Sequence, residues 1–448
     1  METTKGFIFD YSKCVGCHAC VVACVLENKT QPPMAWRQVK HFNKEKLPLL
    51  GFVNLSIACN HCKEAPCLEA CPTNAFSFDN ETNAVIHDNQ ACIGCKYCTW
   101  ACPFDAPKYN AQTGLVEKCN FCNDRLKKGM EPACTTSCPT GALTFGEIPV
   151  VSSPQTAGLT FRHIYPRIIV KNESVIHSIP TIDSNAAGVE FTDIQKYYAK
   201  RYSLKSILPE LPLAVFTFIG SFLVGLLTTY ALKPIVTVPL WAFMGLGIIA
   251  ILFSTFHLGK PLRSYKSVSN IRSSWLSREI LLFGIFMGTG TLALFLQLKV
   301  LIIIAIIAGY CFLGAVEMLY YTTKKGNSPY INSANTIITA ILFSAMFLHS
   351  WNVLIALLAI KTMLFIARAY KNGFDKRVST ATVSLLRLSI GFLVPFLLLS
   401  RQDFEFGWIF VSFLILGEFI DRLMFYIDFV PEKPLDNLKE AVIVKKSL

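Results

Sequence analysis

Sixteen of the seventeen cysteines in this chain lie between Cys14 and Cys138, in four groups of four. The groups are Cys14, Cys17, Cys20 and Cys24; Cys59, Cys62, Cys67 and Cys71; Cys92, Cys95, Cys98 and Cys102; and Cys119, Cys122, Cys134 and Cys138. The first and third groups have the spacing C-x2-C-x2-C-x3-C, and the other two each lengthen one gap. Thiolates are soft ligands that select zinc, copper(I) and iron–sulfur clusters, so the pattern indicates metal chemistry.

The spacing favours cubane iron–sulfur clusters. A cubane needs four thiolates on four irons, and C-x2-C-x2-C allows one tight loop to supply three of them. The last cysteine of each group lies on a helical turn and reaches the other cluster of a two-cluster unit. Pro72, Pro103 and Pro139 directly follow that cysteine in three groups and end the turn, because proline cannot continue a helix. This is the bacterial ferredoxin signature, present four times.

Other uses of the cysteines explain the pattern less well. Zinc fits one or two C-x2-C pairs, but four sets with an additional x3-C step are hard to explain that way. Disulfides suit secreted domains, and residues 1–10 have one early lysine, no twin arginine and no long apolar core. Free core cysteines would not keep this register. We interpret the sixteen cysteines as cluster ligands.

Short strands are expected to hold the cysteine loops. Alternating apolar residues predict strands at 7–9, 55–57, 84–86 and 143–145. Residues 28–52 are interpreted as an insertion, in which Pro32 and Pro33 mark a loop. We predict an α+β double ferredoxin-like four-cluster domain at residues 1–150, followed by a wrap and tether at 151–206. Tyrosines and lysines at helical spacing in residues 192–205 fit an interfacial helix or an ordinary surface helix.

The second half of the chain is overwhelmingly apolar. A helix needs about 20 apolar residues to cross a bilayer. We predict an all-α membrane domain of eight transmembrane helices at residues 207–430, with a tail at 431–448. The eight segments are 211–232, 238–257, 279–297, 299–320, 334–350, 351–369, 383–400 and 405–427. An even number of spans puts both ends on one side.

Lysine and arginine are distributed unequally between the two sides of these spans. The segments on the side of the cysteine domain carry fifteen, and the opposite connections carry three: Lys233, Lys299 and Arg401. By the positive-inside rule, the cysteine domain lies in the cytoplasm. This distribution also accounts for the net charge of +12, so a nucleic-acid partner is not needed to explain it.

Ionisable groups within the apolar half call for an explanation, because each costs roughly 2.5–3.5 kcal/mol at mid-bilayer. His257 ends the second predicted span and Glu279 begins the third, with Gly259, Arg263 and Tyr265 between them. Histidine and carboxylate can exchange protons, while arginine and tyrosine can hold carbonyl oxygens. We interpret these five residues as a quinone pocket.

The remaining features of the apolar half have structural explanations. We expect Lys361, Glu317 and Arg387 to form interhelical ion pairs, although Lys361 with Glu317 and Glu418 could also begin a proton path. Gly284 and Gly288 fit a helix-packing site. The lone Cys311 is expected to be a small buried apolar residue.

The chain resembles a known family in both halves. The first ~190 residues look like the four-cluster iron–sulfur subunit of dimethyl sulfoxide reductase-type molybdoenzymes, at S-I-A-C-N-H-C-K-E-A-P-C (56–67), A-C-I-G-C-K-Y-C-T-W-A-C-P-F-D-A-P-K-Y-N (91–110) and K-C-N-F-C-N-D-R (118–125). The last ~240 residues look like the membrane anchor of that enzyme, at H-L-G-K-P-L-R-S-Y (257–265), S-R-E-I (277–280) and G-E-F-I-D-R-L-M-F-Y (417–426). The chain therefore resembles a fusion of two subunits.

The resemblance implies which cysteines share a cluster. In the family, groups one and four pair, as do groups two and three. The implied sets are Cys14, Cys17, Cys20 and Cys138; Cys24, Cys119, Cys122 and Cys134; Cys59, Cys62, Cys67 and Cys102; and Cys71, Cys92, Cys95 and Cys98. Nitrate reductase relatives have tryptophan at the position of Cys98, where they hold a three-iron cluster. This sequence is therefore expected to hold four 4Fe-4S clusters.

The resemblance also implies an electron-transfer and anchor subunit rather than a catalytic one. Its partner would be a molybdopterin-containing catalytic subunit, and its membrane substrate menaquinol or menaquinone, with His257, Arg263 and Glu279 matching residues linked to menaquinol binding. The expected location is a bacterial inner membrane. Two alternatives remain open: the same relay run oxidatively in a cytoplasm-facing sulfite dehydrogenase, and a module of a proton-moving polysulfide reductase-like complex.

Overall fold

The chain forms two compact units in the computed structural model. One comprises Met1–Val189, Arg272–Ser274 and Pro431–Leu448, and the other Glu190–Ile271 and Trp275–Val430. The structure describes residues 3–31, 34–42, 53–150, 155–156, 159–160, 164–171, 210–234, 238–323, 332–372, 387–395 and 408–428. The interfacial helix expected at 192–205 and the tail at 431–448 lie outside these residues.

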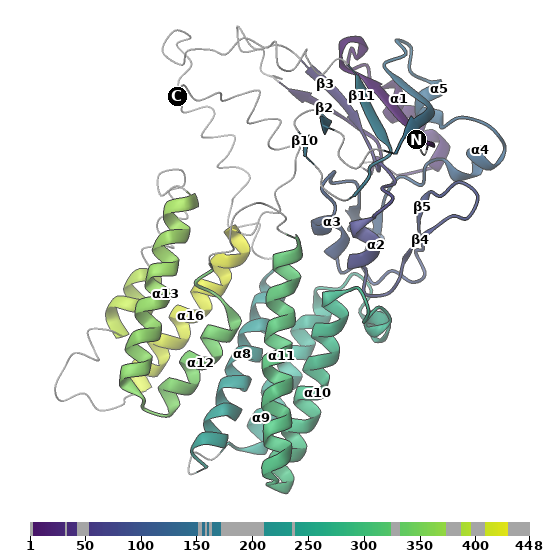
Figure 1. Ribbon diagram of the computed structural model, residues 1–448. Helices are drawn as coiled ribbons and strands as arrows, with labels where there is room; N and C mark the ends of the chain where they lie inside the picture. The colour runs from purple at the N-terminus through teal and green to yellow at the C-terminus, as the bar shows by residue number, and fades with distance from the viewer. Residues whose placement is uncertain are drawn as a thin grey trace, which may run out of the picture. The chain divides into compact units, whose positions relative to one another are not determined.

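A three-stranded sheet in the order β11-β1-β8 forms the centre of the first unit (Figure 1). β1 (Thr3–Asp10) pairs antiparallel with β8 (Leu143–Pro149) and parallel with β11 (Ile168–Lys171). Phe7 and Phe9 alternate along β1 and are 1% and 0% exposed, as expected for one buried face of a strand. They pack with Leu143 and Ile168 in a core that also contains several of the cysteines.

Short hairpins and helices surround this sheet. The hairpins are β2–β3 (Gln38–Phe42, Val53–Ile57), β4–β5 (Phe76–Phe78, Val85–His87), β6–β7 (Lys108–Asn110, Leu115–Glu117) and β9–β10 (Gln155–Thr156, Leu159–Thr160). The helices are η1 (Tyr11–Lys13), α1 (Ala19–Asn28), α2 (Pro66–Ala70), α3 (Tyr97–Ala101), α4 (Asn123–Lys127) and α5 (Ala133–Thr136). The strands expected at 7–9, 55–57, 84–86 and 143–145 are confirmed. The insertion at 28–52 also contains a strand that the sequence pattern did not predict, β2, which pairs with β3.

Helices packed side by side form the second unit (Figure 1). They are α8 (Leu211–Leu232), α9 (Leu240–Phe256), α10 (Trp275–Leu296), α11 (Lys299–Thr323), α12 (Thr336–Phe347), α13 (Trp351–Asn372) and α16 (Trp408–Asp428). Shorter pieces are the 3-10 helix η3 (Pro261–Val268) and the π-helix η4 (Ser389–Leu393). The described helices agree closely with the predicted segments, and most of the segment 383–400 lies outside the described residues.

Three of the described helices are long and apolar enough to cross a membrane: α8, α10 and α11. α9 and η3 meet these criteria only together, and a bend of 103° separates them. α12 has 12 residues, and a short turn at His349 separates it from α13. The described part of the sequence therefore contains three or four candidate spans.

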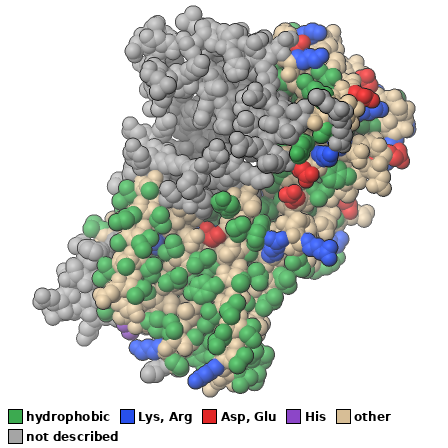
Figure 2. Space-filling model, in the orientation of Figure 1, with side chains coloured by type: hydrophobic (Ala, Val, Ile, Leu, Met, Phe, Trp, Pro, Cys, Tyr) green, Lys and Arg blue, Asp and Glu red, His purple; other side chains and the backbone are tan. Residues whose placement is uncertain are grey.

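The outer surfaces of these helices are apolar. Figure 2 shows hydrophobic side chains over much of the visible face of the helices, and Ile303 and Ile307 of α11 are 57% and 59% exposed. Such a surface suits lipid. The exposure of Cys311 contradicts the expectation that it is buried, because it lies on an outward-facing part of α11.

The glycines that allow close helix packing are not those that the sequence suggested. A Cβ atom on Gly284 or Gly288 would meet no described atom within 4 Å, so the expected packing site is wrong for the described residues. A Cβ on Gly225 of α8 would lie 2.5 Å from the carbonyl oxygen of Ala340 in α12. Small residues let helix backbones approach, and in this unit Gly225 has that role.

Candidate functional site

The four cysteine groups share one backbone conformation. In the opening C-x2-C of each group, the residue before the second cysteine has a positive φ: +70° at Gly16, +44° at His61, +71° at Gly94 and +68° at Phe121. Its amide then points back at the first cysteine, with N–Sγ distances of 3.5 Å to Cys59, 3.4 Å to Cys92 and 3.4 Å to Cys119. Left-handed backbone is uncommon outside glycine, so its use at His61 and Phe121 shows how strictly the loop is specified. The resulting N–H···S bonds favour thiolate charge.

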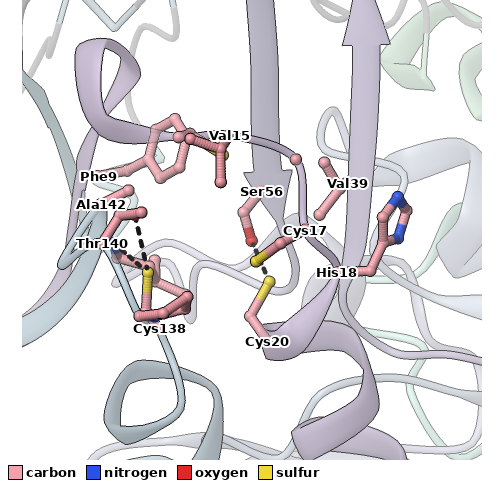
Figure 3. A pocket seen from close by; sticks show the side chains of 14 residues that line it. Phe9, Val15, Cys17, His18, Cys20, Val39, Ser56, Cys138, Thr140 and Ala142 are labelled. Atoms are coloured by element: carbon pink, nitrogen blue, oxygen red, sulfur yellow. Dashed lines mark hydrogen bonds between the residues drawn. The ribbon is translucent and has the colours of Figure 1, made fainter.

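Four cysteines from two distant groups line one hollow: Cys14, Cys17, Cys20 and Cys138. In Figure 3 the sulfur atoms of Cys17, Cys20 and Cys138 turn toward the same space. Burial raises the pKa of Cys138, but hydrogen bonds from Leu143 and Thr140 outweigh it and hold that pKa below its ordinary value. The set is the one that the resemblance assigns to a single cluster.

A second hollow is lined by Cys71, Cys92, Cys95 and Cys98. Cys71 is the C-cap residue of α2, and Pro72 follows it, while Cys98 lies within α3. The C-x3-C step therefore ends on a short helix and directs its last cysteine into the hollow formed by another group.

The other eight cysteines also lie in two neighbourhoods. Burial raises the pKa of Cys62, and the negative charges of Cys59, Cys102 and Cys67 raise it further. Burial likewise raises the pKa of Cys24 to about 11, with Cys134 and Cys122 among the charges that act on it. These are again members of common sets in the implied assignment.

Buried thiols this close together lose their protons more readily to a bound metal than by ionising as free thiolates. Burial, followed by the charge of Cys71, raises the pKa of Cys95 to about 12, so the thiol keeps its proton at neutral pH unless a cation replaces it. All seventeen cysteines are free of disulfides. Among the described residues, no three His, Cys, Asp or Glu side chains are placed to share a single ion. The thiolates of a cubane bind four different irons.

The five residues interpreted as a quinone pocket follow one bend of the second unit. His257 is the half-buried C-cap residue of α9, and Gly259 lies in the turn after it. Arg263 is half-buried on η3, whereas Tyr265 is 72% exposed. Glu279 of α10 is only 4% exposed, and η3 packs against α10, with Ser277 Oγ donating to the Ser267 carbonyl at 2.7 Å. The structure therefore places Glu279 inside and Tyr265 at the surface.

The buried charges of the second unit are paired across helices. Glu418 of α16 accepts from Lys361 Nζ of α13 at 2.8 Å and from Arg387 Nη2 at 2.9 Å. Glu317 of α11 lies 3.9 Å from Arg422 Nη1. The structural pairing expected for Lys361, Glu317 and Arg387 is thereby confirmed.

Several buried charged residues were missed by reasoning from the sequence, among them Asp421 and Arg37. Asp421 is 0% exposed, lies 3.5 Å from Arg387 Nη2 and accepts from Ser333 Oγ at 2.8 Å. Its position three residues after Glu418 was the available signal, because residues at i and i+3 share a helix face. Arg37, 1% exposed in the first unit, had no comparable signal within the segment interpreted as an insertion.

Four sets of cysteines on a ferredoxin-type unit, followed by a unit of apolar helices, define a membrane-anchored iron–sulfur electron-transfer protein. Residues 52–148 match the 4Fe-4S dicluster domain family, and residues 204–370 match the DMSO reductase anchor subunit family (DmsC). This protein belongs to the family of iron–sulfur subunits of dimethyl sulfoxide, thiosulfate and polysulfide reductases, and carries a DMSO reductase-type anchor domain in the same polypeptide. The resemblance to two fused subunits is confirmed.

Three curated relatives illustrate the similarity of the first unit. The thiosulfate reductase electron transfer subunit PhsB of Salmonella typhi is 43% identical over 144 residues, 32% of this chain and 74% of the relative. The B subunit of polysulfide reductase from Wolinella succinogenes is 44% identical over 151 residues, 33% of this chain and 78% of the relative. The B subunit of anaerobic dimethyl sulfoxide reductase from Escherichia coli is 38% identical over 156 residues, 33% of this chain and 76% of the relative.

Proposed function

We propose that this chain relays electrons through four 4Fe-4S clusters between menaquinol and a separate molybdopterin-containing catalytic subunit that reduces an S- or N-oxide. The observation that carries this proposal is the meeting of Cys138 with Cys14, Cys17 and Cys20, and of Cys71 with Cys92, Cys95 and Cys98. Groups far apart in sequence contribute to a common hollow, as the two-cluster ferredoxin pattern requires. When bound, the clusters would supply one-electron carriers held by sixteen thiolates.

The electrons would come from a quinol bound to the second unit. Oxidation of one quinol releases two electrons and two protons, so a quinol site needs proton acceptors as well as an electron route. His257 and Glu279 would take the protons, while Arg263 and Tyr265 would hold the quinone oxygens. The burial of Glu279 supports its role as a proton acceptor shielded from bulk water, and the exposure of Tyr265 is consistent with contact to an arriving quinone.

We further propose eight spans in a bacterial inner membrane, with the iron–sulfur domain in the cytoplasm. The three lysine and arginine residues on one side against fifteen on the other support this orientation. Quinol protons and substrate protons would then be exchanged on the same side, and the cycle would be electroneutral.

The direct test is a reoxidation experiment on membranes that contain the complete complex. Menaquinol should reduce clusters amounting to about 16 irons per chain, and an S- or N-oxide should reoxidise them. Reoxidation must require the catalytic partner, and membranes that lack the partner are the control. A protein without cubane signals would refute the relay. Cluster reduction by sulfite in place of menaquinol would support the oxidative sulfite dehydrogenase.

A second function is favoured by the buried charges. Lys361 of α13, Glu418 of α16 and Arg387, which lies just before η4, form a continuous series of contacts, and a proton-moving polysulfide reductase-like complex would need such a path. In proteoliposomes, proton movement coupled to turnover that disappears in Lys361→Met but persists in Thr362→Val would establish it. Turnover without proton movement would leave the electroneutral relay.

A further inference from the structure

Arg37 is a fully buried cation within the iron–sulfur unit. It lies just before β2 and is 1% exposed. Its guanidinium carbon is 4.5 Å from the centroid of the Phe7 ring, and Nη1 donates to Ser56 Oγ at 3.1 Å. Ser56 Oγ is in turn 3.3 Å from Cys20 Sγ. One hydroxyl therefore links Arg37 to a proposed cluster ligand.

No acid neutralises this guanidinium within the part of the chain that the structure describes. The described ion pairs do not include Arg37, and its buried Nη2 has no hydrogen-bond acceptor there. Burying an unpaired charge costs several kcal/mol, so proteins pair such charges or place them beside a metal centre. An anion that the polypeptide does not provide would account for both the buried charge and the unused donor.

The negative charges that act on Arg37 are those of cysteines. Burial lowers the pKa of Arg37, but the charges of Cys134, Cys119, Cys20 and Cys24 together raise it above its ordinary value. Cys20 belongs to one proposed cluster, whereas Cys24, Cys119 and Cys134 belong to its pair-mate. The Arg37 backbone also hydrogen-bonds to the Cys24 thiol, and its side chain reaches Cys20 through Ser56. Arg37 is therefore connected to ligands of both proposed clusters.

We propose that Arg37 is the shared counter-charge of these two clusters and holds the reduction potentials of both above the values they would have without it. The inference rests on the proposed cluster assignment. Reduction adds one negative charge to a 4Fe-4S cluster, and a fixed cation in a low-dielectric site stabilises the reduced form more than the oxidised form. Arg37 therefore acts on the clusters through its fixed positive charge and takes no part in catalysis.

The test is a redox titration, monitored by electron paramagnetic resonance, of the complete chain in its membranes. In Arg37→Gln, the two clusters of this pair should be at least tenfold less reduced at a given potential, which is 59 mV for a one-electron couple. The other two clusters should keep their potentials. Arg37→Lys retains the charge and should restore most of the shift. Arg125→Gln is the matched control, since Arg125 lies in the same unit but forms a partly exposed pair with Glu27 at 3.3 Å.

Each outcome decides the proposal. Unchanged potentials in an assembled Arg37→Gln protein, or an equal fall at all four clusters, would overturn it. If Arg37→Gln does not assemble clusters, Arg37→Met decides: it removes the charge but keeps an apolar side chain against Phe7, so it should lower both potentials, and no shift there refutes the role. A wild-type protein whose iron and spin counts do not fit four cubanes would refute the proposed relay before Arg37 is tested.

Discussion

Glu279 combines burial with a position at the start of α10, and this makes it the most informative single residue of the proposed quinol site. Burial disfavours the charged form of a carboxylate that is 4% exposed and so favours its uptake of a proton, whereas glutamine cannot accept one. We predict that Glu279→Gln and His257→Ala each lower menaquinol-driven turnover at least tenfold, about 1.4 kcal/mol in transition-state free energy. Turnover driven by a reduced dye, which delivers electrons directly to the iron–sulfur unit, should stay unchanged.

The control for this pair is Thr255→Val. Thr255 lies two residues before His257, and its hydroxyl bonds only to the Ile251 carbonyl of its own helix in the described contacts. It should therefore retain full menaquinol turnover. Normal menaquinol kinetics in both Glu279→Gln and His257→Ala would remove these residues from the site.

Individual residues differed in how far the sequence revealed them. The cysteines were predictable because their spacing carries the chemistry, and the ion pairs of Lys361 and Arg387 because charge in an apolar helix demands a partner. Arg37 was not predictable, since arginine in a polar loop is ordinary until β2 and β3 bury it. The burial of Arg37 depends on tertiary packing, and no local pattern around it encodes that packing.

At the scale of elements, the close packing of α8 against α12 depends on one glycine, Gly225. A Cβ on Gly225 would lie 2.5 Å from the Ala340 carbonyl oxygen and 3.0 Å from Phe343 Cβ, and backbone cannot move aside as a flexible side chain can. We predict that Gly225→Ala destabilises the second unit by about 1–3 kcal/mol, the usual cost of overpacking. The loss should appear as a lower midpoint of thermal inactivation in detergent.

Gly288→Ala provides the matched comparison for Gly225→Ala. No described atom lies within 4 Å of a Cβ at Gly288, and alanine favours a helix over glycine by about 1 kcal/mol. Its inactivation midpoint should therefore stay the same or rise. Equal losses in both variants would show that glycine flexibility, and not the contact between α8 and α12, determines stability.

The elements show where sequence periodicity succeeds and where it stops. Apolar length located the helices of the second unit within a few residues, because a bilayer imposes that length. Gly284 and Gly288 had the correct spacing for packing but lie on the exposed side of α10, since spacing does not state which face meets a neighbour. The strand β2 was missed because its partner β3 lies across an insertion, and pairing at that distance leaves no local signal.

For the whole molecule, the decisive question is whether α9 crosses the membrane. Its 17 residues span about 25 Å as a helix, less than the ~30 Å hydrocarbon core. A bend of 103° then leads into η3. If α9 did not cross, Lys260, Arg263 and Lys266 would lie on the outer side, against the positive-inside rule. The charge distribution therefore favours a crossing that length alone leaves marginal.

Reporter fusions test this crossing directly. With α8, α9, α10 and α11 all spanning, a fusion after Lys325 lies in the cytoplasm, so green fluorescent protein should fluoresce there and alkaline phosphatase should be inactive. A fusion after Lys233 follows a single span and should show active phosphatase, which controls for export of the reporter. Without a crossing by α9, three spans would precede Lys325, and phosphatase fused there would be active. That result would overturn the eight-span arrangement and the shared side of quinol and substrate protons that depends on it.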